Sequence, residues 1–217
     1  MNKHENGQKE GLVKTYYQSG QLAAEENYKN GKLEGVTKTY YESGQLAAEE
    51  NYKNDKLEGL KKVYHENGKL RYEGNYKNDE EEGLHKAYFE SGNIDLETNY
   101  KNSKKEGLTK AYYETGKLNW ETNYKNDKEE GLSRNFYEDG TIEYEGRYKN
   151  GEMEGLHKAY YENGKIDCKT NYKNGKKVGL QTIYDEDGQL VVKEKHESRM
   201  GEQYHYKEAD CLTKGNK

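Results

Sequence analysis

The 217-residue sequence contains no proline and only two cysteines, Cys168 and Cys211. Because proline is absent, no stiff proline-rich linker marks a boundary between domains. Two cysteines are too few for a disulfide framework, and these two lack the spacing of a metal site. Only 30% of the residues are hydrophobic, and no apolar run is long enough for a transmembrane helix. These shortages disfavour a disulfide-stapled, zinc-binding or helical membrane protein, and also a globule with a thick core.

Tyrosine and balanced charge are what the sequence has instead. It contains 23 tyrosines, each of which can bury its ring while its hydroxyl stays hydrated. The 36 basic and 41 acidic residues give a formal net charge of −5, which argues against a broad nucleic-acid footprint. We therefore expect an ordered but thin structure rather than a disordered chain.

A 24-residue unit is repeated eight times without an insertion. A fixed period in this range is the signature of a repeat architecture. The predicted repeats are 11–34, 35–58, 59–82, 83–106, 107–130, 131–154, 155–178 and 179–202. Residues 1–10 align with the end of a repeat and form a partial N-terminal copy. Residues 203–217 are expected to form a C-terminal cap strand at 203–207 and a tail.

Each repeat alternates two short segments with two turns. In 107–130 the segments are Gly-Leu-Thr-Lys-Ala-Tyr-Tyr and Leu-Asn-Trp-Glu-Thr-Asn-Tyr, and they end at Glu-Thr-Gly and Lys-Asn-Asp. Asn and Gly tolerate the positive φ angles that tight hairpin turns require. Segments of about seven residues with apolar residues at every second position are typical of strands. The sequence thus predicts an all-β fold, an elongated single-layer antiparallel meander with one β-hairpin per repeat.

The alternation assigns side chains to two faces. We expect a largely apolar face that contains Leu108, Lys110, Tyr112, Leu118, Trp120 and Tyr124. The opposite, polar face contains Thr109, Ala111, Tyr113, Asn119, Glu121 and Asn123. If Tyr112 lies opposite Leu118, then Lys110 lies opposite Trp120, close enough for a cation–π contact.

The segment 144–151, Tyr-Glu-Gly-Arg-Tyr-Lys-Asn-Gly, is followed by Glu154-Gly155-Leu156 and by Tyr-Tyr-Glu-Asn-Gly at 160–164. This pattern closely resembles the bacterial variant of a MORN (membrane occupation and recognition nexus) repeat, and the resemblance covers residues 6–200. It implies stacked hairpins in a twisted, single-layered sheet with a grooved face. It also implies contact with proteins or lipids, and bacterial proteins of this kind are often described as antitoxin components.

Candidates for catalysis or metal binding are weak. His85 and His157 occupy equivalent positions three repeats apart, too distant to share a metal, and we expect them to be exposed strand histidines. A glutamate recurs in the second segment of six repeats, which is typical of a solvated stripe. Cys168 falls at an apolar-face position and is expected to be buried rather than nucleophilic. We therefore expect no cofactor, no metal and no enzymatic activity.

A comparison of the repeats with one another suggests a binding site. One position varies where its neighbours stay fixed, and its occupants are Ala24, Ala48, Tyr72, Leu96, Trp120, Tyr144, Cys168 and Val192. We expect the central members of this variable row to form a binding patch, because aromatic anchors dominate many interfaces. The predicted partner-binding residues are Tyr72, Leu96, Trp120, Tyr144, Lys62, Lys86, Lys110 and Arg134. The alternative is that the variable side chains only fill the groove.

These observations favour a non-enzymatic protein-binding scaffold, an antitoxin- or immunity-like protein whose aromatic groove binds a toxin or effector protein. One alternative is a peripheral module that binds anionic membrane lipid through the row of lysines. Another is a surface-exposed, adhesin-like array, which requires an export signal. The first ten residues contain no apolar signal segment, so we expect a cytoplasmic protein, with a secreted or surface location if a signal precedes this sequence. We do not expect nucleic acid as a partner.

Overall fold

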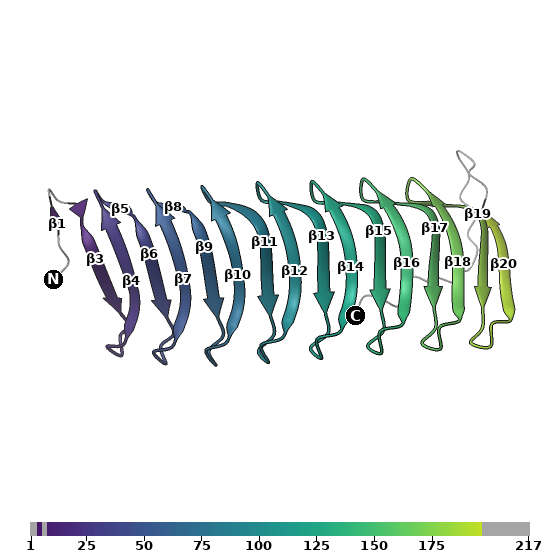
Figure 1. Ribbon diagram of the computed structural model, residues 1–217, viewed down its shortest axis with the longest axis horizontal. Coiled ribbons are helices and arrows are strands. Elements are labelled where there is room, and N and C mark those ends of the chain that lie inside the picture. Colours follow the sequence, from purple (N-terminus) through teal and green to yellow (C-terminus); the bar gives the residue numbers. More distant parts are fainter. Residues whose placement is uncertain (1–3, 6–7, 197–217) are drawn as a thin grey trace. The chain divides into compact units, whose positions relative to one another are not determined.

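The computed structural model describes residues 4–5 and 8–196, and this part of the chain consists of strands and tight turns without a helix (Figure 1). The predicted all-β antiparallel meander is confirmed. The predicted cap strand and tail at 203–217 lie outside the described residues. The contacts divide the chain into two compact units, which we describe separately.

The first unit comprises Met1–Gly107 and Glu114–Gly116. Its strands are β1 (His4–Glu5), β2 (Gln8–Lys9), β3 (Gly11–Tyr16), β4 (Leu22–Lys29), β5 (Lys32–Leu33), β6 (Gly35–Tyr40), β7 (Leu46–Lys53), β8 (Lys56–Leu57), β9 (Gly59–Tyr64), β10 (Leu70–Lys77), β11 (Glu80–Tyr88) and β12 (Ile94–Lys101). β1 pairs with β2, and from β3 to β12 the longer strands pair antiparallel in chain order. β4 pairs with both β5 and β6, and β7 with both β8 and β9, so each short strand and its successor form one interrupted strand.

The second unit comprises Leu108–Tyr113 and Lys117–Lys217, and β13 (Lys104–Tyr112) contributes residues to both units. The remaining strands are β14 (Leu118–Lys125), β15 (Lys128–Phe136), β16 (Ile142–Lys149), β17 (Glu152–Tyr160), β18 (Ile166–Lys173), β19 (Lys176–Tyr184) and β20 (Leu190–His196). From β14 to β20 each strand pairs antiparallel with the next. Both units therefore repeat the same hairpin.

The two turns of each repeat follow the predicted chemistry. Between β10 and β11, Asn78 and Asp79 have φ angles of 52° and 70°, the pair of positive values that defines a type I′ hairpin turn. At the other end of the hairpin, Gly68 has a φ of 83° and donates its N–H to the carbonyl of His65 at 2.9 Å. Both turns demand residues that tolerate positive φ, which explains why Asn and Gly recur there.

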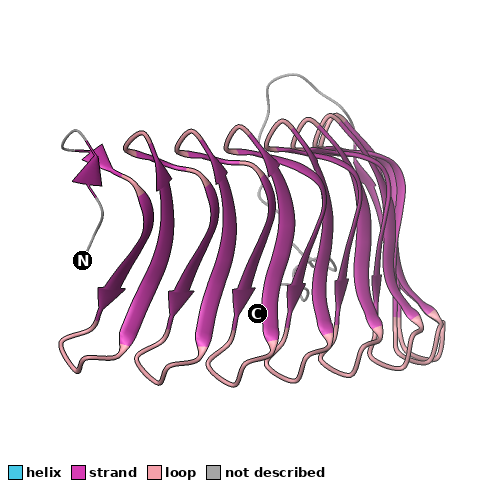
Figure 2. Cartoon of the chain, turned by 60° about the vertical axis from the view of Figure 1, so that its left-hand side comes forward, coloured by secondary structure: helices cyan, strands magenta, loops and turns pink. Residues whose placement is uncertain are grey.

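From Gly83 onward, the glycine that opens a repeat lies inside a strand and bends it, whereas Gly35 and Gly59 begin β6 and β9. Gly83 lies inside β11 with a φ of 78°, and the pairing of β10 with β11 shifts beside it, between Glu73 and Asn75. Nothing lies within 4 Å of the place where a Cβ would be, so the backbone conformation rather than lack of space requires glycine. Figure 2 shows the resulting bend in the strands of the first unit.

Side chains tie each hairpin to the next one. The second aromatic residue of a repeat donates its hydroxyl hydrogen to a backbone carbonyl of the following repeat, as Tyr41 does to Tyr64 at 2.6 Å and Tyr161 to Tyr184 at 2.7 Å. A second contact lies at the opposite end of the hairpin. There a glutamate directly before the opening glycine accepts the backbone N–H of the turn asparagine in the next repeat. Glu58 accepts from Asn78 at 2.9 Å in this way. These contacts account for much of the repetition in the sequence.

A β-bulge overturns the predicted faces. In 131–154, Phe136 lies opposite Ile142, which matches the prediction for Tyr112 and Leu118 one repeat earlier, but Arg134 lies opposite Glu145. The extra residue, Glu143, reverses the alternation in the rest of β16. The predicted pairing of a lysine with the variable row was therefore wrong, because the basic residue of a repeat lies opposite a glutamate.

Two faces replace the predicted ones. We call "inner" the face that carries Tyr72, Tyr76, His85, Leu96, Thr98 and their equivalents in other repeats. We call "outer" the face that carries Lys62, Tyr64, Glu73, Leu84, Lys86 and their equivalents. The inner face is the buried one, since His85 is 3% exposed and Thr98 1%, whereas Leu84 is 41% exposed.

Candidate binding surfaces

The predicted partner-binding residues lie on both faces of the sheet. Tyr72 and Leu96, each opposite Ala87, are on the inner face, and so are Trp120 and Tyr144, each opposite Asn135. The basic residues Lys62, Lys86, Lys110 and Arg134 are at outer positions. Lys62, Lys86 and Arg134 each lie opposite a glutamate on both neighbouring strands. The structure thus divides the predicted site into two surfaces, because the bulge separates the two rows.

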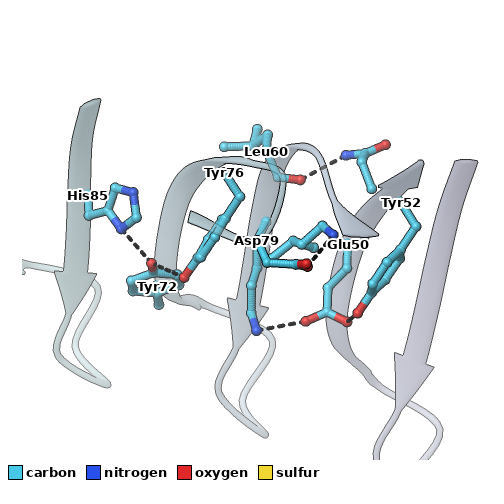
Figure 3. A network of polar contacts seen from close by, with 10 residues as sticks. Glu50, Tyr52, Leu60, Tyr72, Tyr76, Asp79 and His85 are labelled. Atoms are coloured by element: carbon cyan, nitrogen blue, oxygen red, sulfur yellow. Dashed lines mark hydrogen bonds and ion pairs between the residues drawn. The ribbon is translucent and has the colours of Figure 1, made fainter. Parts of the chain in front are cut away.

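A hydrogen-bonded cluster of Tyr72, Tyr76 and His85 occupies the inner face of the first unit (Figure 3). The Tyr72 hydroxyl lies 2.7 Å from that of Tyr76 and 2.6 Å from Nδ1 of His85. His85 Nε2 lies 2.9 Å from the carbonyl of Asn75, which can only accept, so Nε2 carries the hydrogen. The Tyr72 hydroxyl bridges Nδ1 of His85 and the Tyr76 hydroxyl, and the Glu81 carboxylate lies 3.6 Å from the same Nδ1. All three side chains are satisfied within the chain.

The second unit repeats this cluster with Tyr144, Tyr148 and His157. The Tyr144 hydroxyl donates to Nδ1 of His157, and Nε2 of His157 donates to the carbonyl of Arg147 at 2.8 Å. The ring of Tyr172 packs 4.8 Å from the His157 ring, centroid to centroid. Gly146 is part of the cluster, because a Cβ at this position would overlap the imidazole of His157 and the Tyr144 hydroxyl.

Burial fixes the protonation of this second cluster. It lowers the pKa of His157 below 6.5, and it is also the main cause of the raised pKa of Tyr144. Both groups are therefore neutral near pH 7. The expectation of exposed histidines was wrong, since His85 and His157 are 3% and 1% exposed. Converging tyrosines cover each of them, and a glycine on the adjacent strand makes room for the ring.

Earlier in the first unit, Glu50 (Figure 3) and Lys61 occupy the positions that Gly74 and His85 have one repeat later. Glu50 accepts the Tyr52 hydroxyl at 2.9 Å and Lys61 Nζ at 2.7 Å. Burial, followed by the bond to Glu50, raises the pKa of Tyr52 to about 12. Different repeats thus fill the same place on the inner face with different polar side chains. In each case the residues in contact come from neighbouring strands.

The variable row belongs to this inner packing. Tyr72 and Tyr144 are held by the buried histidines, and Cys168 is 1% exposed, as predicted for a small buried residue. Leu96 and Trp120 are partly buried. The row therefore offers a partner less free aromatic surface than its sequence suggests.

A ladder of alternating charge crosses the outer face of the first unit. In the order of the strands its members are Lys14, Glu25, Lys38, Glu49, Lys62, Glu73, Lys86 and Glu97, each opposite the next. Ion pairs join Lys14 to Glu25 at 2.7 Å and Lys86 to Glu97 at 3.3 Å. Lys14, followed by the Tyr40 hydroxyl, lowers the pKa of the Glu25 carboxyl. The lysines are thus neutralised by their neighbours.

The ladder of the second unit loses its alternation toward β20. Glu121, Arg134, Glu145 and Lys158 still alternate, but Lys158 lies opposite Lys169, which is followed by Thr182 and Lys193. Lys169 Nζ lies 5.7 Å from the centre of the Tyr184 ring. One repeat earlier, the residue at the position of Lys169 is Glu145, which accepts the Tyr160 hydroxyl. This end of the outer face carries an excess of positive charge.

Apolar side chains remain exposed on the outer face of the first unit. Leu12, Val36, Leu60 and Leu84 occupy one position of successive repeats and are 50%, 41%, 37% and 41% exposed. Tyr16, four residues after Leu12 on the same strand face, is 60% exposed. The leucine positions thus form a regular exposed row on one side of the charge ladder. On the other side Tyr16 is exposed, whereas its equivalents Tyr40, Tyr64 and Tyr88 are half-buried.

The sequence contained a signal for the buried clusters that the position-by-position comparison missed. Tyr72, Gly74 and His85 occur together, and the same three residue types recur together as Tyr144, Gly146 and His157. Joint variation at three positions indicates mutual packing, whereas variation at one position alone does not. The outer leucine row gave no such signal, because its positions hardly vary.

Among the described residues, no three of His, Cys, Asp and Glu are grouped so that they could hold a metal ion. The same residues include no helix that could span a membrane. What the geometry offers is two extended surfaces, one packed and one exposed.

Comparison with known proteins agrees with this architecture. No curated protein matches the chain. The model of the MORN repeat variant matches residues 9–30, 33–54, 57–78, 81–102, 105–126, 129–150, 153–174 and 177–197. MORN repeats are generally modules that bind proteins or lipids and are not a known enzyme family. Because the matched segments cover most of the sequence, the chain belongs to the family of MORN repeat variant proteins.

Proposed function

We propose that this chain is a non-enzymatic scaffold that binds a partner protein on its outer face. The observation that carries the proposal is the row formed by Leu12, Val36, Leu60 and Leu84, which stays exposed on a regular surface. Repeated exposed apolar side chains mark interaction sites in soluble proteins. The inner tyrosines, by contrast, already have hydrogen-bond partners within the sheet.

Protein is a better partner for the first unit than anionic lipid. Each lysine of its ladder lies opposite a glutamate on at least one side, so Lys62 and Lys86 offer little net attraction to a negatively charged surface. Their alternating charges disfavour a partner that carries a strong charge of either sign. In the second unit, Lys110 and Arg134 occupy the same place in their repeats.

The test compares matched substitutions on the two faces. The purified chain captures partners from an extract of its source cells, and each captured protein is then titrated against variants. We expect the double variant L60D/L84D to weaken binding about tenfold or more, while L96A on the inner face keeps it within about twofold. The reverse result, loss with L96A or W120A alone, would return the site to the aromatic groove.

A toxin or effector is the specific partner that the family resemblance suggests, and a cytoplasmic location belongs to the same proposal. Coexpression with the product of a neighbouring gene tests it directly. Rescue of growth by the wild-type chain, lost with L60D/L84D, supports this form of the proposal. Absence of any complex between the two proteins contradicts it.

Binding to anionic lipid is a second candidate, favoured by the excess of positive charge around Lys169 and Lys193. A lysine near a negatively charged membrane contributes about 1 kcal/mol to binding. We expect flotation with phosphatidylserine vesicles at low salt to be reduced by K169E and K193E. No flotation of the wild-type chain under these conditions rejects this candidate.

A further inference from the structure

One row of aromatic side chains on the outer face of the first unit recurs once per hairpin. We call Tyr16, Tyr40, Tyr64 and Tyr88 the tyrosine row. The last three hydroxyls donate to glutamates of the preceding repeat: Tyr40 to Glu25 at 2.8 Å, Tyr64 to Glu49 at 3.3 Å and Tyr88 to Glu73 at 2.8 Å. These bonds hold the rings in place, and a surface ordered in advance loses less entropy on binding.

The spacing of the tyrosine row restricts the conformation of a partner segment. Neighbouring strands lie about 4.8 Å apart, so equivalent residues two strands apart recur about every 9.6 Å. A polyproline II helix presents the same face every three residues, or about every 9.3 Å. Across the three intervals from Tyr16 to Tyr88, the mismatch adds up to only about 1 Å.

Other regular conformations fit this spacing less well. An α-helix with one contact residue per heptad advances about 10.5 Å, and its mismatch reaches about 3 Å over three intervals. A β-strand advances about 10 Å in three residues but turns successive contact residues to opposite sides. Of these three conformations, the polyproline II helix is the one that matches the distance and returns successive contact residues to the same side.

We propose that the tyrosine row of the first unit binds a proline-rich segment of a partner protein in the polyproline II conformation, with one turn per hairpin. This inference rests on the proposed function, because it specifies what docks on the outer face. Proline-rich segments dock on aromatic surfaces at low entropic cost, since their conformation exists before binding. The segment must come from another protein, because this chain contains no proline.

The neighbouring charge ladder is compatible with an uncharged segment. Its lysines and glutamates balance one another, so the electrostatic potential at the tyrosine row is not strongly positive or negative. Lys62 lies two residues from Tyr64 on the same face, where its ammonium group can donate to the exposed carbonyls of a polyproline II helix. Affinity then depends on the number of rings in contact rather than on charge.

The experiment measures how affinity depends on peptide length, using the full chain and fluorescein-labelled oligoprolines of four, seven and ten residues. Ten residues are the shortest length that reaches four rings at three residues per turn. We expect the affinity to increase about three- to tenfold with each added turn, and a ten-residue Gly-Ser peptide to bind at least about tenfold more weakly than ten prolines. Fluorescence anisotropy at two salt concentrations gives these values and shows that charge contributes little.

Variants of one ring locate the site. Y64A interrupts the row, so we expect about fivefold or greater loss of affinity for the ten-residue peptide. Y64F keeps the ring but loses the bond to Glu49, so we expect a smaller loss of affinity than in Y64A. L96A alters only the inner face and should bind within about twofold of wild type. Hydrogen exchange of the wild-type chain gives a readout independent of folding, with protection by the peptide confined to the strands that carry the row.

Three results would overturn the inference: equal binding of four and ten prolines, equal binding of the Gly-Ser peptide, or a correctly folded Y64A with unchanged affinity. If oligoproline does not bind while L60D/L84D still abolishes partner capture, the polyproline segment is wrong and the outer-face scaffold stands. If L60D/L84D has no effect on a captured partner, the proposed function itself fails.

Discussion

The inner and outer faces of the sheet differ in how they use the repeat, and two adjacent residues of β16 illustrate the difference. Glu145, on the outer face, belongs to a ladder that most hairpins repeat. Gly146, on the inner face, departs from the usual residue because His157 fills the space beside it. Inner variation is therefore matched between neighbouring strands. At Gly146 it reflects packing between β16 and β17.

The largest effect is expected from Gly146→Ala. A Cβ at this position would overlap the buried ring of His157 and the Tyr144 hydroxyl, and the ring cannot move away without losing its hydrogen bonds. Overpacking of this kind costs about 1–3 kcal/mol, and we expect a value near the upper end. Urea unfolding, followed by circular dichroism and by hydrogen exchange of β16 and β17, measures the loss.

A matched double variant tests the cause. G146T/H157S reproduces the combination of Thr122 opposite Ser133 that the chain already contains, so it should recover most of the lost stability. Gly155→Ala is the control, because it tests the cost of replacing a glycine that has a positive φ but no close neighbour. Its φ of 78° makes alanine strained although the space is open, with an expected cost of about 1–2 kcal/mol. Gly146 itself has no positive φ, so a cost of G146A no larger than that of G155A would contradict a tight contact between this position and His157.

An intermediate effect is expected from acid. Because burial lowers the pKa of His157 below its ordinary value of 6.5, the neutral ring contributes stability that is present above that pH and lost as the pH falls through the lowered pKa. The urea midpoint should therefore decrease below pH 6.5 by more in wild type than in G146T/H157S. Identical pH profiles of the two proteins would contradict a buried neutral histidine.

The sequence predicted the hairpins well because the information is local. Asn78 and Gly68 mark their own turns, and the alternation between turns identifies the strands. The bulge was not predictable in the same way, because Glu143 resembles an ordinary strand residue and one extra residue reverses the face of everything after it. The pairing of basic residues with the variable row failed for that reason alone.

The candidate surfaces were predicted only in part. The basic and variable rows exist, but which of them is exposed depends on the bend at glycines such as Gly83 and on the tyrosines that converge over the inner face. The bend is a property of several strands together. The exposed Leu84 resembles an ordinary core residue in the sequence, so only the structure identifies it as surface.

The smallest effect is expected on the outer face, from Glu145→Gln. The Glu145 carboxylate accepts Lys158 Nζ and the Tyr160 hydroxyl, each at 2.8 Å, and Lys158 followed by Tyr160 lowers its pKa below 4.5. These contacts contribute stability above pH 4.5, which is lost as the pH falls through the lowered pKa. Because the two charged side chains are 25% and 30% exposed, water screens the pair and the cost should be about 0.5–1 kcal/mol, smaller still in high salt. Urea unfolding of E145Q beside G146A measures both faces of one strand under identical conditions. If E145Q costs as much as G146A, the ladder rather than the inner packing holds the hairpins together, and the outer face is less free to bind a partner than its exposure suggests.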